Sequence, residues 1–190
     1  MLKHYPYRVP HIRQGELIEL TDLRDRPLMI APRKGVRRLG LIRRVVLVAL
    51  RDTQQRIYIQ QRGPLCDAMP GFWELSATGH VQAGESREDA ARRELAEEIN
   101  IRHVRLIRLA EHAPDKESDA FSTLFLAGPT GESPEPNPEE VSGGMFLDED
   151  ELKALAAYSP ELITPALHWA LNTGRLFSRE KDFSEPLPKI

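Results

Sequence analysis

The sequence predicts an α/β (α+β) protein in which a mixed β-sheet is sandwiched between helices. Two observations lead to this prediction. Strand-like segments stand both before and after one strong central helix, and further helical segments follow near the end of the chain. With 190 residues the chain has the length of one domain. We therefore expect residues 1–190 to form a single domain.

Composition and charge narrow the class of protein. A content of 41% hydrophobic and 29% charged residues is typical of globular proteins, and a net charge of −3 argues against bulk nucleic-acid binding. The single cysteine, Cys66, excludes an intrachain disulfide framework and a multi-thiolate zinc site. The longest apolar run, residues 45–50, is far shorter than the ~20 residues that span a bilayer, and the first residues lack the apolar core of a signal peptide. We expect a cytoplasmic protein that binds neither nucleic acid nor membranes.

The first part of the chain has the pattern of strands and turns. Two short apolar segments flank a polar stretch and predict an N-terminal β-hairpin over residues 16–31. Residues 43–50 are apolar and β-branched, as expected of a buried central strand, and residues 56–61 alternate as a neighbouring antiparallel strand would. Residues 63–84 are rich in glycine and turn formers, so we expect mostly loop there.

A helix is predicted from about Ser86 to Ile99. Ser86 followed three residues later by Asp89 is a capping-box pattern, and Asn100 stands where a left-handed residue is expected to end the helix. In the rest of the chain we expect strands, one exposed proline-rich loop and two helices. The strands are expected at 104–110, 121–126 and 145–147, the loop at 128–140, and the helices at 148–157 and from Ser159 onward. The last helix would have Pro160 at its first position and Gly174 just past its end.

The predicted central helix carries an unusual row of acids. Helical spacing places Ala91, Leu95 and Ile99 on one apolar stripe that must face the core. The adjacent face carries three acids, here called the helix carboxylates: Glu94, Glu97 and Glu98. Oxygen ligands at this density suit a hard divalent cation, Mg²⁺ or Mn²⁺, better than zinc. Spacing alone also allows a solvated acidic face.

The surrounding sequence favours the metal site. Residues 79–101, GHVQAGESREDAARRELAEEINI, resemble the signature of the Nudix hydrolase superfamily without a gap, through Gly79, Glu85, Arg93-Glu94-Leu95, Glu97-Glu98 and Ile101. The one departure is Asn100 where the family has glycine, and asparagine tolerates the left-handed conformation. The resemblance covers roughly residues 40–170 and implies the Nudix fold. The N-terminal hairpin, the Gly79-His80-Val81 start and the helix at 159–169 resemble the branch grouped with isopentenyl-diphosphate isomerase.

The resemblance implies roles for several of these residues. The helix carboxylates would hold Mg²⁺ or Mn²⁺, and one of them would act as, or orient, the general base. The Gly79 carbonyl is a further expected ligand, and Glu85 and Arg93 would pair to tie the loop to the helix. The implied reaction is hydrolysis of a phosphorus-containing anhydride by attack of water. A carboxylate outside the signature often completes such a site, and Glu140 is the first choice, followed by Glu139 and Glu111.

Three more residues are candidates for substrate binding, each with a structural alternative. Arg62 can bind a phosphate bidentately or form a surface ion pair. Trp73 can stack on a base or belong to the core, and His80 can contact a metal or phosphate or neither. The basic run at 33–44 can attract anionic substrates or be a solvated strand entry. Cys66, with no histidine close in sequence, is expected to take no part.

Three functions remain to be compared. The leading prediction is a metal-dependent hydrolase that cleaves a diphosphate linkage in a nucleoside diphosphate derivative or similar small molecule. An isomerase of the related branch would need a cysteine before the glycine–histidine pair and a histidine in the central strand, but the chain has Thr78 and Ile42-Arg43-Arg44 there. A non-catalytic nucleotide-binding module usually loses carboxylates that this chain keeps. The sequence leaves a homodimer open.

Overall fold

The computed structural model describes residues 17–178 except residues 35, 37–40, 67 and 117. Residue 16 of the expected hairpin, part of the basic run and the C-terminal tail therefore lie outside the described residues. The described part forms β1 (Leu17–Thr21), β2 (Pro27–Pro32), β3 (Arg43–Asp52), β4 (Ile57–Arg62), β5 (Trp73–Leu75), β6 (Ala77–His80), α1 (Arg87–Ile99), β7 (Leu106–His112), β8 (Ala120–Thr130), β9 (Val141–Leu147), α2 (Glu149–Tyr158), a 3₁₀ turn η2 (Pro160–Leu162) and α3 (Pro165–Asn172).

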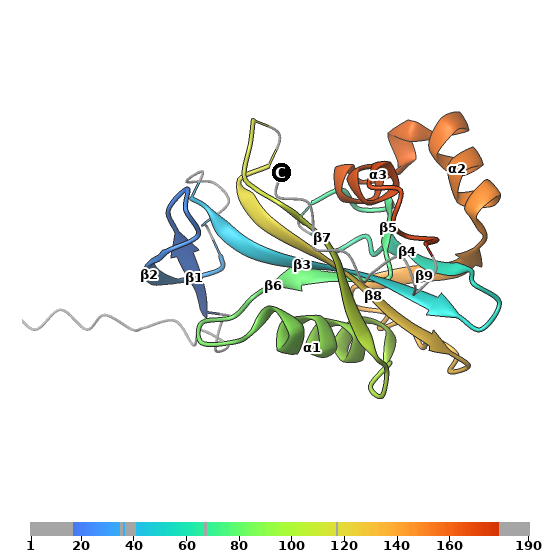
Figure 1. The fold of residues 1–190 in the computed structure, drawn as a ribbon, viewed down its shortest axis with the longest axis horizontal. Coiled ribbons are helices and arrows are strands. Elements are labelled where there is room, and N and C mark those ends of the chain that lie inside the picture. The colour runs from blue at the N-terminus through green and yellow to red at the C-terminus, as the bar shows by residue number, and fades with distance from the viewer. Residues whose placement is uncertain (1–16, 35, 37–40, 67, 117, 179–190) are drawn as a thin grey trace, which may run out of the picture.

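The strands form one mixed sheet between helices, as predicted. β3 lies at its centre, antiparallel to β4 and β6 and parallel to β8. α1 covers one face, and α2 and α3 cover the other (Figure 1). Successive residues of β3 alternate between the two cores: Val46 and Val48 pack in the cluster that contains α1, and Leu47 and Ala49 in the cluster that contains α2 and α3. None of the helices within the described ranges is long and apolar enough to cross a membrane.

The N-terminal hairpin is confirmed and extends the same sheet. β1 and β2 pair antiparallel, with Ile18 opposite Ala31, and β1 continues onto β3 where Leu20 lies opposite Arg43. Ile18 and Leu20 are buried, whereas β2 is exposed along almost its whole length. The hairpin is therefore held through β1.

The central helix begins and ends as predicted, with one difference at its start. The Ser86 side chain accepts a hydrogen bond from the Asp89 amide at 3.0 Å. The Asp89 carboxylate accepts from the Ser86 hydroxyl at 2.7 Å instead of completing a capping box. Asn100 adopts the left-handed conformation at φ +56° and ends the helix.

Residues 63–84 are mostly loop, as predicted, but they also contain the short strands β5 and β6, which are too brief to show a periodic apolar pattern. The bounds of other elements differ from the prediction. β8 runs on to Thr130 and takes the first residues of the expected loop, whose remainder is mostly exposed. β9 begins at Val141, earlier than expected. The prediction started the strand too late because Gly143 and Gly144 resemble turn residues. Gly144 is instead required by close packing, since a Cβ there would lie 2.1 Å from the Tyr58 hydroxyl.

The single helix predicted from Ser159 is divided. Pro160 opens only the 3₁₀ turn η2, and α3 begins later, with Thr164 as its N-cap and Pro165 in its first turn. The chain is extended between them because the Thr164 amide donates to the Trp73 carbonyl on β5 at 2.9 Å. Gly174 follows the helix end at φ +67°, as predicted.

Candidate active site

The core packing of α1 decides which carboxylates face the sheet. Ala91, Leu95 and Ile99 are fully buried, so the predicted apolar stripe is confirmed. Glu94 and Glu98, one turn apart, are turned inward with it and are only 6% and 5% exposed. The Glu97 side chain is 50% exposed. The helix carboxylates are therefore a buried pair with a third acid at the rim.

Gly79 on β6 makes room for the first of this pair. A Cβ at this position would lie 1.8 Å from Oε1 of Glu94, closer than any real contact. β6 is positioned there by pairing with the central strand, where Gly79 lies opposite Val46. The glycine of the signature is thus needed for the carboxylate to approach the strand backbone.

Arg93 ties the preceding loop to the helix, in the role that the resemblance implies. Its Nε and Nη2 donate to the two oxygens of Glu85 at 2.9 and 3.0 Å, and Nη2 also donates to the His80 carbonyl at 2.9 Å. Its Nη1 donates to Glu94 at 2.7 Å. Burial alone would lower the pKa of Arg93, but its bonds to Glu85 and Glu94 outweigh this and raise the pKa above its ordinary value.

Glu98 lies in the most strongly acidic surroundings. Its Oε2 accepts from Nε2 of Gln60 on β4 at 2.5 Å. Burial raises the pKa of Glu98 well above its usual range, and the negative charges of Glu94, Glu74 and Glu140 raise it further, although the Gln60 bond opposes the shift. Carboxylates from α1, β5 and the loop before β9 therefore lie near enough for their charges to act on Glu98.

Glu140, the first choice outside the signature, is one of these carboxylates. It is exposed, but its backbone is anchored: its carbonyl accepts from the Gly63 amide at 2.7 Å and from the Cys66 thiol at 3.3 Å. A Cβ on Gly63 would approach that carbonyl oxygen to 2.9 Å, so the glycine permits the contact. The hydrogen bond of Cys66 places its thiol beside the loop that carries Glu140, although the sequence predicted no functional role for this cysteine.

The two reserve candidates are placed differently. Glu111 lies on β7, where its carboxylate pairs with Arg108 at 3.1 Å. The Glu139 backbone amide donates to the Asn137 side chain at 3.1 Å, and Glu139 is exposed. Neither acid is among the largest influences on the pKa of Glu98, whereas Glu140 is.

Sequence reasoning missed Glu74 and Gln60. Alternation along β4 turns Tyr58, Gln60 and Arg62 toward the face that α1 covers, and Glu74 lies opposite Gln60 on β5. Glu74 is buried and pairs with Arg62. Period-two spacing on β4 is the signal that could have pointed to this face.

The three predicted substrate-binding residues are only partly brought together. Arg62 pairs with Glu74, and its Nε donates to the Ala68 carbonyl at 2.9 Å. The His80 imidazole accepts from Nε of Arg43 at 3.1 Å. Trp73 packs in the cluster of α2 and α3, on the opposite face of the sheet, in the core position that the sequence left open.

The described end of the basic run is neutralised. Arg43 pairs with Asp119 at 2.6 Å, and Arg44 pairs with Glu19 at 2.6 Å and Asp25 at 2.7 Å. These two arginines serve the packing of the hairpin and the strand entry. Whether the basic run at 33–44 attracts anionic substrates stays a prediction, because residues 35 and 37–40 of this run lie outside the described ones.

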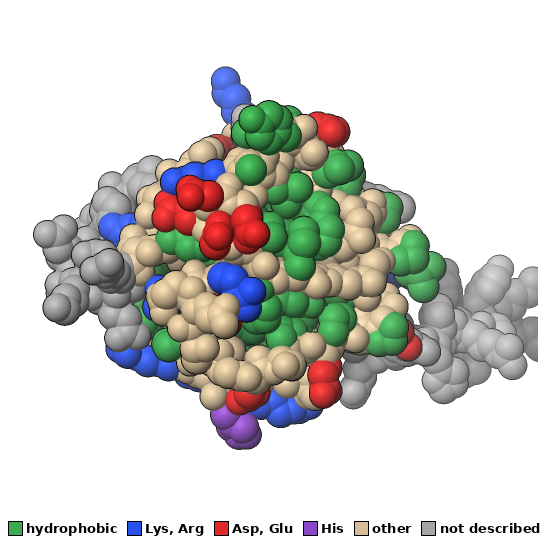
Figure 2. Space-filling model, turned by 90° about the vertical axis from the view of Figure 1, so that its right-hand side faces the viewer, with side chains coloured by type: hydrophobic (Ala, Val, Ile, Leu, Met, Phe, Trp, Pro, Cys, Tyr) green, Lys and Arg blue, Asp and Glu red, His purple; other side chains and the backbone are tan. Residues whose placement is uncertain are grey.

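The donor set fits a hard divalent cation. Within the described ranges no group of three or more His, Cys, Asp or Glu side chains has the geometry of a formed metal site. A cation would nevertheless relieve the repulsion between the carboxylates around Glu98. In the described part of the chain, Oε1 of the buried Gln60 also has no hydrogen-bond partner. Acidic side chains also gather on the surface near α2, whose first turn holds Glu149–Glu151 (Figure 2). Those acids are exposed, whereas Glu94, Glu98 and Glu74 are buried.

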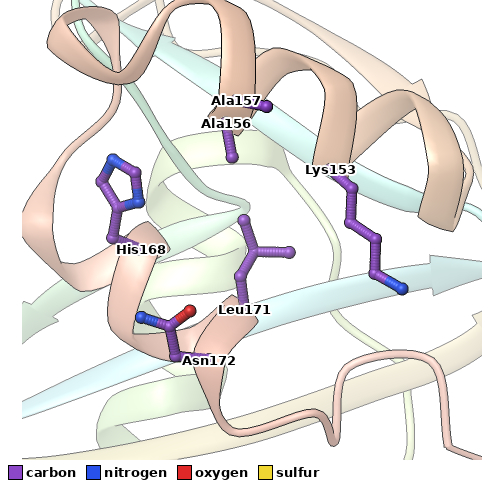
Figure 3. A pocket seen from close by; sticks show the side chains of 6 residues that line it. All are labelled: Lys153, Ala156, Ala157, His168, Leu171 and Asn172. Atoms are coloured by element: carbon purple, nitrogen blue, oxygen red, sulfur yellow. The ribbon is translucent and has the colours of Figure 1, made fainter.

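A pocket elsewhere does not share this chemistry. It lies between α2 and α3 and is lined by Lys153, Ala156, Ala157, His168, Leu171 and Asn172 (Figure 3). Lys153 is paired with Glu149 at 2.6 Å. Because α2 and α3 cover the face opposite α1, this pocket is separate from the carboxylate cluster.

Fold, signature and buried carboxylates together define the class of protein, and comparison with known proteins agrees. A model of the NUDIX domain matches residues 41–167, and the chain therefore belongs to the Nudix family. The uncharacterized Nudix hydrolase PA4841 of Pseudomonas aeruginosa is 36% identical over 136 residues, covering 70% of this chain and 79% of that protein.

Two further relatives cover more of the chain. Isopentenyl-diphosphate Delta-isomerase of Nocardia farcinica is 30% identical over 170 residues, covering 86% of this chain and 97% of that protein. The crystal structure of DR0079 from Deinococcus radiodurans superimposes with a TM-score of 0.71 at 27% identity, covering 86% of this chain and all of that one. The family expected from residues 79–101, and its fold, are confirmed. A protein of Deinococcus radiodurans, 33% identical over 116 residues, also carries the name Nudix hydrolase.

Proposed function

We propose that this protein is a metal-dependent hydrolase that cleaves a diphosphate linkage in a nucleoside diphosphate derivative or a similar small organic pyrophosphate. The observation that carries the proposal is the buried pair Glu94 and Glu98, set against Gly79 in a signature that has lost none of its acids. Burying two carboxylates one helical turn apart costs free energy, and a bound cation would offset that cost.

Glu94, Glu98, the rim acid Glu97 and Glu140 are the residues that would hold Mg²⁺ or Mn²⁺, together with the Gly79 carbonyl. When bound, such a cation neutralises charge on phosphate oxygens and makes water a better nucleophile near neutral pH. The chain itself positions these ligands. Arg93 orients the Glu94 carboxylate through a hydrogen bond, and the Gly63 amide fixes the backbone of Glu140.

Arg62 is the proposed phosphate contact. Its Nη1 and Nε are engaged by Glu74 and Ala68, which leave Nη2 without a partner among the described residues. Because these two bonds already fix the orientation of the guanidinium, it can donate to a phosphate oxygen with little further loss of side-chain freedom. One of the helix carboxylates would accept the proton of the attacking water.

An isomerase remains the second candidate because of the relative from Nocardia farcinica. The position before Gly79 is Thr78, whose hydroxyl is far less acidic than a thiol. The thiol that this chain does have, Cys66, donates to the Glu140 carbonyl from another loop. These observations favour the hydrolase.

The test is a substrate panel. Purified protein is incubated with Mg²⁺ or Mn²⁺ and nucleoside triphosphates, nucleotide sugars, ADP-ribose, NADH, dinucleoside polyphosphates, CoA and isopentenyl diphosphate. We expect metal-dependent release of phosphate or monophosphate from at least one compound, lost in Glu97→Gln and Glu98→Gln. Hydrolysis that is indifferent to these substitutions would contradict the site, and isomerisation of isopentenyl diphosphate would reverse the ranking.

A further inference from the structure

We propose that Gln60 is a positioning residue of the metal site, whose amide nitrogen fixes the Glu98 carboxylate in the orientation that receives the cation. The inference rests on the proposed function, since it assumes that Glu98 is a ligand. It adds a neutral residue from β4, outside the signature, to the residues that determine metal affinity.

The place of Gln60 in the fold commits its side chain to this face. It is 3% exposed and lies between Tyr58 and Arg62 in the alternation of β4, opposite Glu74 on β5. Its Nε2 donates to Oε2 of Glu98 at 2.5 Å. A buried, charge-assisted bond of this kind fixes a carboxylate more firmly than contacts with solvent do.

No other group of the described cluster orients Glu98 in the same way. The Thr78 amide lies 3.4 Å from both carboxylate oxygens, too long and too symmetric to select one orientation. The two nearby cations are engaged elsewhere: Arg93 with Glu85 and Glu94, and Arg62 with Glu74.

The other end of the same amide is also informative. Oε1 of Gln60 is buried and has no hydrogen-bond partner among the residues that the structure describes. An unsatisfied buried acceptor is costly, so it is expected where something absent from the protein chain satisfies it. A cation with its hydration shell supplies such a partner beside Glu98.

The chemistry explains why the residue is glutamine. A glutamate would add a fourth negative charge to the surroundings of Glu98, which already include Glu94, Glu74 and Glu140, and an ionised glutamate could not donate the bond. An apolar residue would leave Glu98 without its shortest hydrogen bond. Only a neutral side chain with both a donor and an acceptor meets both demands.

The experiment compares Gln60→Met with Gln54→Met, since Gln54 is an exposed glutamine in the turn between β3 and β4. Mn²⁺ binding is measured by electron paramagnetic resonance on the full chain without substrate. We expect Gln60→Met to weaken Mn²⁺ binding by about 10- to 100-fold, the range typical of residues that orient metal ligands, and Gln54→Met to leave it unchanged. Thermal melting in chelator checks that each variant is folded.

Gln60→Asn serves as a second, more conservative variant, because its amide is shorter by one methylene and cannot span to Glu98. Binding of Mn²⁺ within twofold of wild type in both Gln60 variants would overturn the inference. Glu98→Gln distinguishes a failure of this inference from a failure of the proposed function. If Glu98→Gln also binds Mn²⁺ normally, the proposed metal site itself is wrong. If Glu98→Gln weakens binding but the Gln60 variants do not, only the role of Gln60 is refuted.

Discussion

The backbone of Gly79 and the carboxylate of Glu94 are in contact at a distance that no side chain at position 79 would permit, since a Cβ would lie 1.8 Å from Oε1. The contact joins β6 to α1 and sets how closely the helix carboxylates approach the strand. The family's glycine is therefore required by space at this point, because nothing larger than its hydrogen atom fits between the strand and the carboxylate.

Gly79→Ala should displace Glu94 and separate it from Arg93. We expect kcat/KM to fall about 100-fold, near 3 kcal/mol of transition-state stabilisation, with a loss of about 1–3 kcal/mol in the free energy of unfolding from overpacking. Steady-state kinetics and urea denaturation measure the two effects. Gly143→Ala is the matched control, because a Cβ there meets nothing within 4 Å, and it should leave both quantities near wild type.

Glu98→Gln should remove activity and yet stabilise the metal-free protein. Because the pKa of Glu98 is raised in the folded state, the folded chain holds this proton more tightly than the unfolded chain. Its contribution to stability is therefore lost as pH rises from about 4.5 through the raised pKa. In chelator, we expect the variant to melt above wild type at pH 8, with the difference shrinking toward pH 5.

The exposed neighbour provides the comparison for that melting experiment. Glu97→Gln removes a charge that is half in solvent, so its melting temperature in chelator should stay close to wild type at both pH values. A Glu98→Gln protein that melts below wild type at pH 8 would show that the buried carboxylate is stabilising without metal, against the expectation.

Arg93→Lys should fail although it keeps the positive charge. A lysine ammonium cannot bond both oxygens of Glu85, the His80 carbonyl and Glu94 at once. We expect a loss of about 1–3 kcal/mol in unfolding free energy and at least a tenfold fall in kcat. Arg108→Lys, at an exposed pair with Glu111, should change neither the free energy of unfolding nor kcat. Equal effects of the two substitutions would contradict the proposal that Arg93 orients the site.

The acid outside the signature can be identified by three parallel substitutions. Glu140→Gln should weaken Mn²⁺ binding about tenfold, because its charge acts at Glu98, whereas Glu139→Gln and Glu111→Gln should have little effect. Calorimetric titration with Mn²⁺ measures all three. A larger effect at Glu139 or Glu111 than at Glu140 would show that the wrong acid was chosen.

Much of the fold could be predicted because its signals are local. The Ser86 cap, the stripe through Leu95 and the left-handed Asn100 each depend on residues within a few positions, and the helix formed where they indicated. Strands without such signals were missed. β5 is three residues long, and only its pairing with β4 makes it a strand.

The site divides in the same way. The sequence by itself determined the family, the helix and the acids that the helix carries, because a motif and a helical period are read from spacing alone. Only the tertiary structure decided that Glu94 and Glu98 are buried while Glu97 is exposed, that Gln60 bonds to Glu98, and that the charges of Glu74 and Glu140 act on Glu98. The physical reason is that this meeting depends on strand alternation, on register such as Gln60 opposite Glu74, and on a loop anchored through Gly63. Each of these relations joins residues far apart in the chain.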